Sequence, residues 1–459
     1  MTRLQLVSPI DGSVLVERDG ATLEAAQAAL ASARAAQAQW KRRPLGERVG
    51  IVRGFLDALL AMSDEVVPEL ARQMGRPVRY GGEFGGVKER GEYMLSIAET
   101  ALAPLEIEDS DAFHRFIARA PLGVVMVIAP WNYPFLTAIN AIIPALVAGN
   151  AVVLKHATQT LLAGERFQMA ADRSDLPPGL FRNLALDHAV TEALLSSGAV
   201  NFVNFTGSVG GGRAIERACA GTFTGIGLEL GGKDPGYVME DADIDRAVDT
   251  LIDGAMFNSG QCCCGIERIY VAESLFDDFV GKAVAIVEQY RLGNPLDPET
   301  TLGPMAHARF AALVREQSAA AIAGGATALI DPARYAADAP GTAYLAPQIL
   351  VDVDHTMRVM REESFGPVVG IMKVGDDAEA IRLMNDSDFG LTASLWTAER
   401  ARAEAIGREI ETGTVFMNRC DYLDPALCWT GCKDTGRGAS LSALGYHGLT
   451  RPKSYHLRT

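Results

Sequence analysis

A chain of 459 residues, of which 48% are hydrophobic and 22% charged, is long enough to form two or three globular domains. Its formal net charge of −15 argues against nucleic acid as a partner, because the phosphate backbone would be repelled. Seven cysteines, three of them contiguous, do not have the pattern of a disulfide framework. The sequence also predicts neither a signal peptide nor a membrane span, which favours the cytoplasm.

The first hundred residues predict a short hairpin followed by helices. Pro9 and Asp11-Gly12 mark a turn within an extended segment over residues 1–20. Thr22 is suited to cap a helix that ends near Trp40. Two further helices are predicted over about 45–74 and 83–103.

From residue 113 onward, strands alternate with helices. A mixed strand over 113–119 is followed by the apolar run 123–129, which is typical of a buried strand. Asn132 comes directly after that run, at the place where open α/β sheets hold their ligands. Strands are predicted at 151–154, 182–186 and 201–205, and a helix at about 137–148. This alternation indicates βαβ units and a parallel sheet.

The glycine-rich segment Thr206–Gly212 joins a predicted strand to a helix expected from about Arg213. Such a turn exposes backbone N–H groups at a helix N-terminus and suits an anion such as a pyrophosphate. The spacing differs from the usual G-x-G-x-x-G, and a tight turn without a ligand explains it equally well.

A second alternation follows Gly232 and predicts a second α/β domain. It begins with a helix over about 243–258. The expected strands are 268–271, 345–351, 368–374, 392–396 and 414–418, the expected helices are 275–290, 305–323, 376–385 and 399–411, and a final strand is expected near 452–457.

The segment Phe257–Cys264 contains three adjacent thiols after a Ser-Gly break. A nucleophilic cysteine needs a turn that exposes it and a neighbour that deprotonates it. Gly260 can supply the turn, and Glu229 is the candidate base. Core packing, a redox role and a metal site are the alternatives. Metal is set aside, because contiguous cysteines cannot easily surround one tetrahedral ion.

Six motifs occur in order along the chain: Pro130-Trp131-Asn132, Lys155, Phe205-Thr206-Gly207-Ser208, Glu229-Leu230-Gly231-Gly232-Lys233, Gly260-Gln261-Cys262-Cys263, and Glu362-Glu363-Ser364-Phe365-Gly366-Pro367. With these motifs the chain resembles the aldehyde dehydrogenase superfamily, of the NAD(P)-dependent hydrolytic type, over essentially its whole length. The resemblance implies an α/β fold with two doubly wound domains and a small β-flap. It places the cofactor-binding domain at 1–103 and 122–230, the catalytic domain at 231–435, and the flap at 104–121 and 436–459. Such flaps pair subunits, so a homodimer or homotetramer is expected.

The resemblance also implies the chemistry. The family form Gly-Gln-x-Cys selects Cys263 as the nucleophile that attacks an aldehyde. The Asn132 side-chain amide and the Cys263 backbone N–H would stabilise the oxyanion. Glu229 would activate the water that cleaves the resulting thioester. Cys262 and Cys264 would then be neighbours of the pocket, with simple packing as their favoured role.

The cofactor implied by the resemblance is NAD or NADP. The expected contact residues are Trp131, Lys155, Thr158, Gly207, Ser208, Leu230, Glu363 and Phe365. Many members have Lys-Pro-Ser-Glu where this chain has Lys155-His156-Ala157-Thr158. Thr158 cannot repel a 2′-phosphate as that glutamate would, and Lys155, with a contribution from His156, could attract one. NADP is therefore expected to be tolerated and even preferred.

The substrate is expected to be a small aldehyde, with no metal in the site. The residues expected to line its tunnel are Tyr133, Leu136, Phe257, Cys262, Cys264, Arg419 and Tyr422, the last two within the loop 419–423. Apolar and aromatic walls favour an uncharged aldehyde, whereas Arg419 could bind the carboxylate of a semialdehyde or form a structural salt bridge. The segment 428–438 departs from the family's glycine-rich pattern and can alter the pocket.

Three other functions remain open from the sequence. A CoA-acylating semialdehyde dehydrogenase would release the thioester to CoA, and it would not need the base Glu229. A non-catalytic relative would tend to lose the nucleophile or the base, whereas this chain keeps Asn132, Glu229 and Cys263. A thiol-redox protein would use the cysteine triplet itself.

Overall fold

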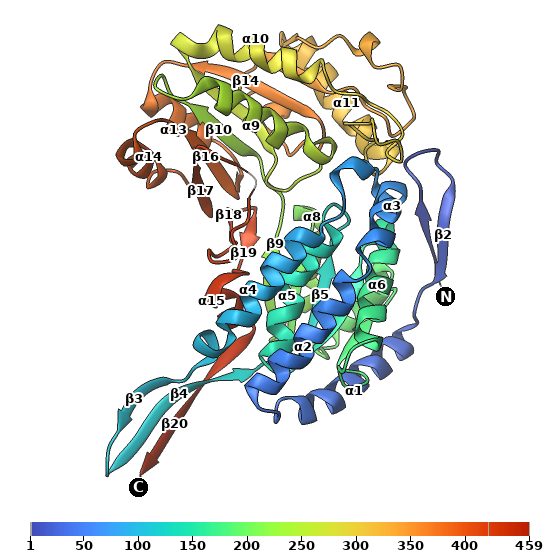
Figure 1. Ribbon diagram of the computed structural model, residues 1–459, viewed down its shortest axis with the longest axis vertical. Coiled ribbons are helices and arrows are strands. Elements are labelled where there is room, and N and C mark those ends of the chain that lie inside the picture. The colour runs from blue at the N-terminus through green and yellow to red at the C-terminus, as the bar shows by residue number, and fades with distance from the viewer. Residues whose placement is uncertain (1, 421, 459) are drawn as a thin grey trace.

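The computed structural model describes residues 2–420 and 422–458, so Asp421 of the predicted loop 419–423 lies outside the described residues. Two α/β units stand one above the other, and a narrow β arm projects from the lower unit with the C-terminus at its tip (Figure 1). The N-terminal hairpin lies at the opposite edge, where β1 (Arg3–Val7) pairs with β2 (Val14–Asp19) in antiparallel register. This is the hairpin predicted from Pro9 and Asp11-Gly12.

The lower unit contains a six-stranded sheet in the order β19-β9-β8-β5-β6-β7. Its central strands are parallel, whereas the edge strand β19 runs antiparallel to β9. Every residue of β5 and β6 is buried, which explains the continuous apolar sequence of β5 and of the first four residues of β6. The strands are β5 (Val124–Ala129), β6 (Ala151–His156), β7 (Phe181–Asn183), β8 (Phe202–Thr206), β9 (Gly225–Glu229) and β19 (Gly436–Arg437).

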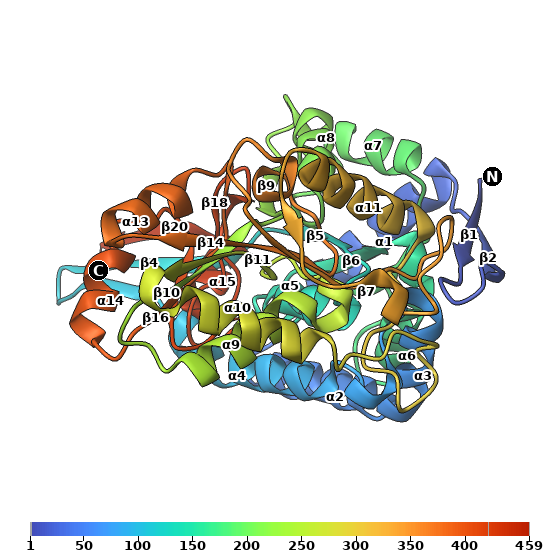
Figure 2. The ribbon, with the colours of Figure 1, turned by 90° about the horizontal axis from the view of Figure 1, so that it is seen from above.

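Helices pack on both faces of this sheet (Figures 1 and 2). Their buried side chains form one large core together with the strands. Thr22 caps the first helix through a bond from the Ala25 N–H, as predicted. The predicted helix 45–74 is interrupted at Ala61-Met62. The helices are α1 (Leu23–Trp40), α2 (Leu45–Leu60), α3 (Ser63–Met74), α4 (Phe84–Leu102), α5 (Pro134–Val147), α6 (Leu161–Asp172), α7 (His188–Ser196) and α8 (Val209–Cys219).

The upper unit contains a seven-stranded sheet in the order β12-β13-β14-β11-β10-β16-β17, parallel except for β12. The strands are β10 (Asp234–Val238), β11 (Ile266–Ala272), β12 (Thr327–Ala328), β13 (Gln348–Val351), β14 (Val368–Val374), β16 (Thr392–Trp396) and β17 (Thr414–Met417). The helices are α9 (Ile244–Met256), α10 (Phe276–Val287), α11 (Ala308–Ala323), α12 (Arg358–Arg361), α13 (Asp377–Asn385) and α14 (Arg400–Gly407). Strands β9 and β10 are absent from the sequence-based prediction, because glycine and proline interrupt their apolar pattern.

The projecting arm is a three-stranded antiparallel sheet in the order β20-β4-β3. It is formed by β3 (Leu105–Asp109), β4 (Phe113–Pro121) and β20 (Thr450–Arg458). Of the predicted flap range 436–459, only β20 belongs to this arm, so the predicted range begins too early. Strand β19 extends the six-stranded sheet of the lower unit, and α15 (Ser442–Gly448) packs on α4 and α5.

Helix α8 begins at Val209, four residues before the predicted start, because the Ser208 hydroxyl accepts a hydrogen bond from the Gly211 N–H and caps it. The two remaining short strands, β15 (Phe389–Gly390) and β18 (Cys432–Lys433), pair with each other. Within the described part of the chain, no helix is both long and apolar enough to cross a membrane.

Candidate active site

A cavity of about 170 Å³ lies where the two α/β units meet, and it contains the cysteine triplet and Glu229 on its walls. Helices α4 and α5 contribute one side, and the strand ends of β8 and β9 contribute another. Its described lining residues are Arg90, Tyr133, Leu136, Thr137, Asn140, Thr206, Glu229, Leu230, Phe257, Cys262, Cys263, Cys264, Leu423 and Trp429.

The turn before the thiols has an unusual backbone. Asn258, Ser259 and Gly260 have φ angles of 54°, 56° and 69°, all in the left-handed region. For the two residues with side chains this conformation is uncommon. A Cβ atom at Gly260 would lie 2.2 Å from the Gly366 carbonyl oxygen, so only glycine fits. Gly260 thus supplies the turn expected before the cysteines.

The three cysteines form one cluster. The Sγ atoms of Cys262 and Cys264 are 3.4 Å apart. Cys264 is buried, whereas Cys262 and Cys263 are half-buried. Interaction with the Cys262 sulfur and burial raise the pKa of both Cys263 and Cys264. A nucleophilic Cys263 therefore needs a proton acceptor in the cavity.

Glu229 is the carboxylate in this cavity. It ends strand β9, and its Oε2 accepts a 3.0 Å hydrogen bond from the Thr206 hydroxyl at the end of the neighbouring strand β8. Burial raises the pKa of Glu229, and the Thr206 hydrogen bond partly opposes that shift. A carboxylate with a raised pKa is a stronger base, which suits proton abstraction near neutral pH.

Asn132 does not line the cavity itself, but it is held against the segment that leads to Cys263. Its Nδ2 donates to the Gln261 carbonyl over 3.1 Å, which leaves the second amide hydrogen available. The Cys263 backbone N–H donates to no acceptor within the described part of the chain. One donor suited to an oxyanion therefore belongs to Cys263 itself, and the other is tied to Gln261, two residues before it.

A buried ion pair fixes this region. The Arg76 guanidinium bonds to Glu83 over 2.8 Å and to the Asn132 carbonyl over 2.6 Å. The other carboxylate oxygen of Glu83 accepts from the backbone N–H groups of Phe135 and Leu136, at the start of α5. Both charged side chains are almost fully buried, so each depends on the other.

The carboxyl ends of β5, β6 and β8 carry residues predicted to contact the cofactor. Lys155 is 7% exposed and forms no ion pair or side-chain hydrogen bond with any described residue, and burial lowers its pKa. Thr158 lies in the single turn η2 (Thr158–Thr160) that follows β6. Gly207 and Ser208 lead into α8, and Leu230 packs against Gly212 of that helix. A buried cation without a partner in the described residues and a capped helix N-terminus, at the same end of one parallel sheet, fit a phosphate-bearing dinucleotide.

Glu363 contacts the segment that follows Glu229, and Trp131 belongs to a cluster of aromatic side chains. The Glu363 carboxylate accepts from the Gly232 N–H over 3.0 Å, and burial raises its pKa to about 8. A Cβ atom at Gly231 would lie 2.4 Å from that carboxylate, so the two segments are in direct contact. Trp131 meets the ring of Phe365 edge-on and stacks on Phe310, a residue that the sequence motifs do not identify.

His156 is not placed to attract a phosphate, contrary to the expectation. Its Nε2 contacts the Pro134 carbonyl and its Nδ1 contacts the Thr160 hydroxyl, each over 3.1 Å. Burial lowers the pKa of His156 to about 4, so its ring is neutral at physiological pH. Lys155 is then the remaining cation of this motif.

Five of the seven predicted substrate residues line the cavity, namely Tyr133, Leu136, Phe257, Cys262 and Cys264. Arg419 and Tyr422 are not among its described lining residues. Arg419 is exposed, and its guanidinium lies 4.0 Å from the centre of the Tyr422 ring, whose hydroxyl donates to Glu89.

The sequence analysis missed Arg90, Asn140 and Trp429 in the cavity wall. Arg90 and Asn140 are within hydrogen-bonding reach of each other. A signal for Arg90 was present, because it falls between Val87 and Met94 on the buried face of α4, where a charged residue is unusual. Trp429 lies in the divergent segment 428–438, which the sequence indicated only as a region.

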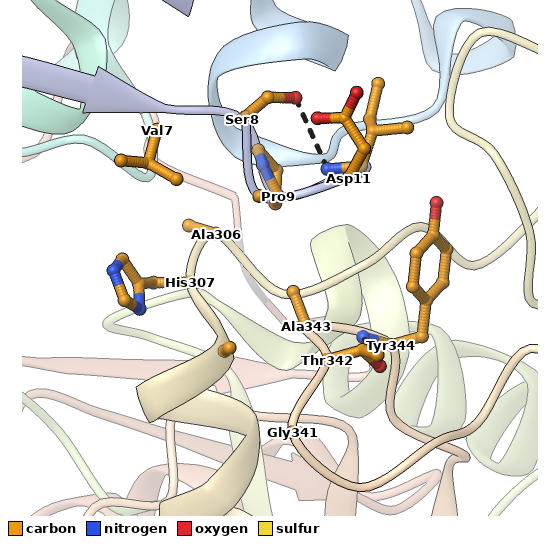
Figure 3. Close-up of a pocket in the computed structure, with 13 residues that line it drawn as sticks. Val7, Ser8, Pro9, Asp11, Ala306, His307, Gly341, Thr342, Ala343 and Tyr344 are labelled. Atoms are coloured by element: carbon orange, nitrogen blue, oxygen red, sulfur yellow. Dashed lines mark hydrogen bonds between the residues drawn. The ribbon is translucent and has the colours of Figure 1, made fainter. Parts of the chain in front are cut away.

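A second cavity, of about 310 Å³, lies between the turn of the N-terminal hairpin and two loops of the upper unit (Figure 3). Pro9, Ala306 and Ala343 face it, together with His307 and Tyr344. The Ser8 hydroxyl, which also borders this cavity, accepts a hydrogen bond from the Ile10 N–H. No cysteine is among its described lining residues, so it is distinct from the site around Cys263.

Comparisons with known proteins agree with this architecture. The model of the aldehyde dehydrogenase family matches residues 1–455. An aldehyde dehydrogenase of Paenarthrobacter nicotinovorans is 34% identical over 455 residues, which are 96% of each chain. A succinate-semialdehyde dehydrogenase [NADP(+)] of Deinococcus radiodurans is 32% identical over 438 residues, covering 94% of this chain and 90% of that protein.

A solved structure extends the likeness to three dimensions. The NADP-dependent glyceraldehyde-3-phosphate dehydrogenase from Bacillus halodurans C-125, complexed with NADP, has a TM-score of 0.93 and 31% identity. The match covers all of this chain and 96% of that one. The fold and site therefore define an α/β dehydrogenase with two parallel sheets. The chain belongs to the aldehyde dehydrogenase family, as its six motifs predict.

Proposed function

We propose that this protein oxidises a small aldehyde to the carboxylic acid, with Cys263 as nucleophile and Glu229 as general base. The cofactor is NAD or NADP, in accordance with the family. The observation that carries the proposal is the meeting of Cys263 and Glu229 on the walls of one small cavity. A thiol nucleophile and a carboxylate base on the walls of one pocket are the two groups that acyl chemistry requires.

The first step is attack of the Cys263 sulfur on the aldehyde carbon. Glu229 takes the thiol proton, because the raised pKa of Cys263 leaves it protonated at rest. The new carbon–sulfur bond converts the carbonyl oxygen into an oxyanion. The Cys263 backbone N–H and the second amide hydrogen of Asn132 donate to that oxygen.

The second step removes a hydride from the thiohemiacetal carbon and leaves a thioester on Cys263. The chemistry that the nicotinamide supplies when bound is acceptance of this hydride. Lys155, Ser208 and Glu363 would hold the ribose and phosphate groups, and Trp131 and Phe365 would flank the dinucleotide. The buried, unpaired ammonium of Lys155 supports this assignment.

The last step is hydrolysis. Once Glu229 has released the thiol proton to solvent, its carboxylate accepts a proton from a water molecule, whose oxygen adds to the thioester carbon. The carbon–sulfur bond then breaks, the carboxylic acid is released, and the Cys263 sulfur leaves as a thiolate. The hydrogen bond from the Thr206 hydroxyl holds the Glu229 carboxylate in place during hydrolysis. Presence of this base favours hydrolysis over transfer to CoA.

We further infer that NADP is accepted. Thr158 stands where many family members have a glutamate, and it carries no charge that would repel a 2′-phosphate. Lys155 nearby is a cation without an ion-pair partner in the described residues. The relatives from Deinococcus and Bacillus are named as NADP-dependent enzymes, which supports the same inference.

Subunit pairing through the β arm is also part of the proposal. Leu105, Ile107 and Leu457 on its strands are exposed, at 62%, 54% and 48%. A projecting sheet with unpaired edges and exposed apolar residues is suited to meet a second copy of itself. All seven cysteines are free, which suits the reducing cytoplasm.

The experiment that tests the function is reduction of NAD and NADP by a panel of aldehydes: short aliphatic, long aliphatic, aromatic and carboxylate-bearing. Cys263→Ala is the catalytic blank, and Cys219→Ala, far from the cavity, is the matched control. We expect activity in the wild type and in Cys219→Ala but not in Cys263→Ala. Absence of activity with every aldehyde and both cofactors would support a non-catalytic relative instead.

A further inference from the structure

We propose that the Arg90 guanidinium binds a carboxylate on the substrate, so that the preferred substrate is a short aldehyde with a carboxylate at its far end. The inference rests on the proposed function, because it assumes that Cys263 receives the aldehyde group of the same molecule. It names the substrate class of that site and the residue that selects it.

Arg90 is the one positively charged side chain among the described residues that line the cavity. It comes from the middle of α4 and is only 8% exposed. The same wall holds Asn140, and Cys263 and Glu229 line the cavity with them. A positive charge and a nucleophile thus face one enclosed space of about 170 Å³. That volume suits a molecule of only a few carbon atoms.

The hydrogen bonds of Arg90 are few and long. Its Nη1 donates to the Leu136 carbonyl over 3.3 Å and to the Asn140 side-chain oxygen over 3.4 Å. It has no carboxylate partner within 4 Å among the described residues. A guanidinium carries five N–H donors in a planar fork, so most of its donor capacity is unused.

Other buried arginines of this chain show what a structural role requires. Arg268 is 1% exposed and donates to the carbonyl oxygens of Lys233, Leu383 and Met384 and to the Tyr270 hydroxyl. Arg76 has the buried partner Glu83. Within the described part of the chain, Arg90 has neither a ring of close acceptors, as Arg268 has, nor a buried carboxylate partner, as Arg76 has. A buried charge without a partner is costly, and an anion that arrives with the substrate removes that cost.

A role as permanent counter-ion of the base does not account for Arg90. The Glu229 carboxylate accepts a hydrogen bond from the Thr206 hydroxyl, and the Arg90 charge helps to lower the pKa of Glu229, but no ion pair within 4 Å joins the two among the described residues. The guanidinium fork instead matches a carboxylate, which accepts two parallel N–H bonds. Arg419, the arginine that the sequence suggested for this task, is exposed and stacked on Tyr422.

The test compares two aldehydes of equal carbon number, succinate semialdehyde and butanal, by kcat/KM. We expect the wild type to favour the carboxylate-bearing aldehyde. In Arg90→Met, which removes the charge but keeps an apolar chain of similar length, the ratio of the two kcat/KM values should fall about 10- to 100-fold. The loss should be mostly in KM. Arg419→Met is the matched control and should keep the wild-type ratio.

Equal preference for the two aldehydes in the wild type, or an unchanged ratio in Arg90→Met, would overturn the inference. If Arg90→Met does not fold, the test uses Arg90→Lys instead. It then measures how well a ligand protects Cys263 from alkylation in the wild type and in this variant. Succinate should slow alkylation of wild-type Cys263 by iodoacetamide more than butanamide does, and this difference should shrink in Arg90→Lys. No difference between succinate and butanamide would also overturn the inference. Failure of the proposed function looks different, because then neither aldehyde reduces the cofactor.

Discussion

The guanidinium of Arg76 donates a 2.6 Å hydrogen bond to the backbone carbonyl of Asn132, although 56 residues separate them in sequence. The same guanidinium reaches Asn258 in the turn before the cysteines, over 3.3 Å. One buried side chain therefore ties the loop after β5 to the loop that presents Cys263. We therefore expect the relative placement of Asn132 and Cys263, the proposed oxyanion donor and nucleophile, to depend on this connection.

Removal of one member of the Arg76–Glu83 pair should weaken both the fold and the site. In Glu83→Gln, Arg76 loses its buried counter-charge, and we expect a loss of about 3–5 kcal/mol in the free energy of unfolding. The kcat should also fall, because Arg76 then holds Asn132 less firmly. Denaturant unfolding and steady-state kinetics measure the two effects. Glu47→Gln, which breaks the exposed pair with Arg43, is the control and should change stability by less than about 0.5 kcal/mol.

Gly260→Ala should displace the nucleophile. Its Cβ atom would lie 2.2 Å from the Gly366 carbonyl oxygen, so the turn and the backbone opposite must move apart. We expect a marked loss of kcat and a fall in melting temperature. Gly12→Ala is a matched control, because Gly12 has φ of 76° but open space around its Cβ position. Its cost should be limited to about 1 kcal/mol of backbone strain and should leave kcat intact. Equal effects of the two variants would contradict the steric argument.

Glu229 should control the acid limb of the pH profile. The base acts only when it is ionised, and burial raises its pKa above the ordinary value. Activity should therefore rise with pH, with a midpoint higher than that of a solvated glutamate, and approach a plateau once Glu229 is ionised. The kcat measured from pH 4 to 9 checks this. Thr206→Val removes a hydrogen bond that lowers the pKa of Glu229, so it should move the midpoint to still higher pH. An unchanged or lower midpoint would contradict this role.

Deacylation gives a second test of Glu229. In Glu229→Gln the thioester should form but hydrolyse slowly, because the amide cannot accept the proton from water. Rapid mixing should then show a burst of cofactor reduction followed by a slow steady state, and mass spectrometry should find an acyl group on Cys263. The burst itself should be slower than in the wild type, because Glu229 also takes the thiol proton in the first step. A variant that turns over at the wild-type rate would exclude Glu229 as the base.

Thr158→Glu should shift the cofactor preference toward NAD. The new carboxylate would repel the 2′-phosphate of NADP and accept hydrogen bonds from the ribose hydroxyls of NAD. We expect the ratio of kcat/KM for NADP over NAD to fall by roughly 10-fold or more, consistent with a charge-assisted contact. Thr158→Gln, which has similar size but no charge, separates repulsion from shape and should shift the ratio less. An unchanged ratio in Thr158→Glu would show that this turn does not approach the 2′-phosphate.

Much of the fold follows from local pattern. The apolar run 123–129 appears as the buried strand β5, and Thr22 caps α1, because both depend on neighbours within a few residues. The apolar pattern that predicts a strand is interrupted where close packing requires glycine or proline. In β10, the Leu251 side chain packs so closely on Gly236 that no larger residue fits there. This glycine interrupts the apolar pattern, so the sequence does not predict β10, although the strand lies inside its sheet.

The sequence by itself determined the family and most of the alternation of strands and helices, and it predicted Asn132, Glu229 and Cys263 as catalytic residues, because these features lie in short motifs with local spacing. The tertiary structure alone decided the surroundings of those residues. His156 is neutral because burial lowers its pKa, and β19 joins the six-stranded sheet of the lower unit because it pairs with β9. Arg90 faces the same cavity as Cys263 only because α4 packs against α5. Burial and contact between distant segments set charge and access, and no local pattern carries that information.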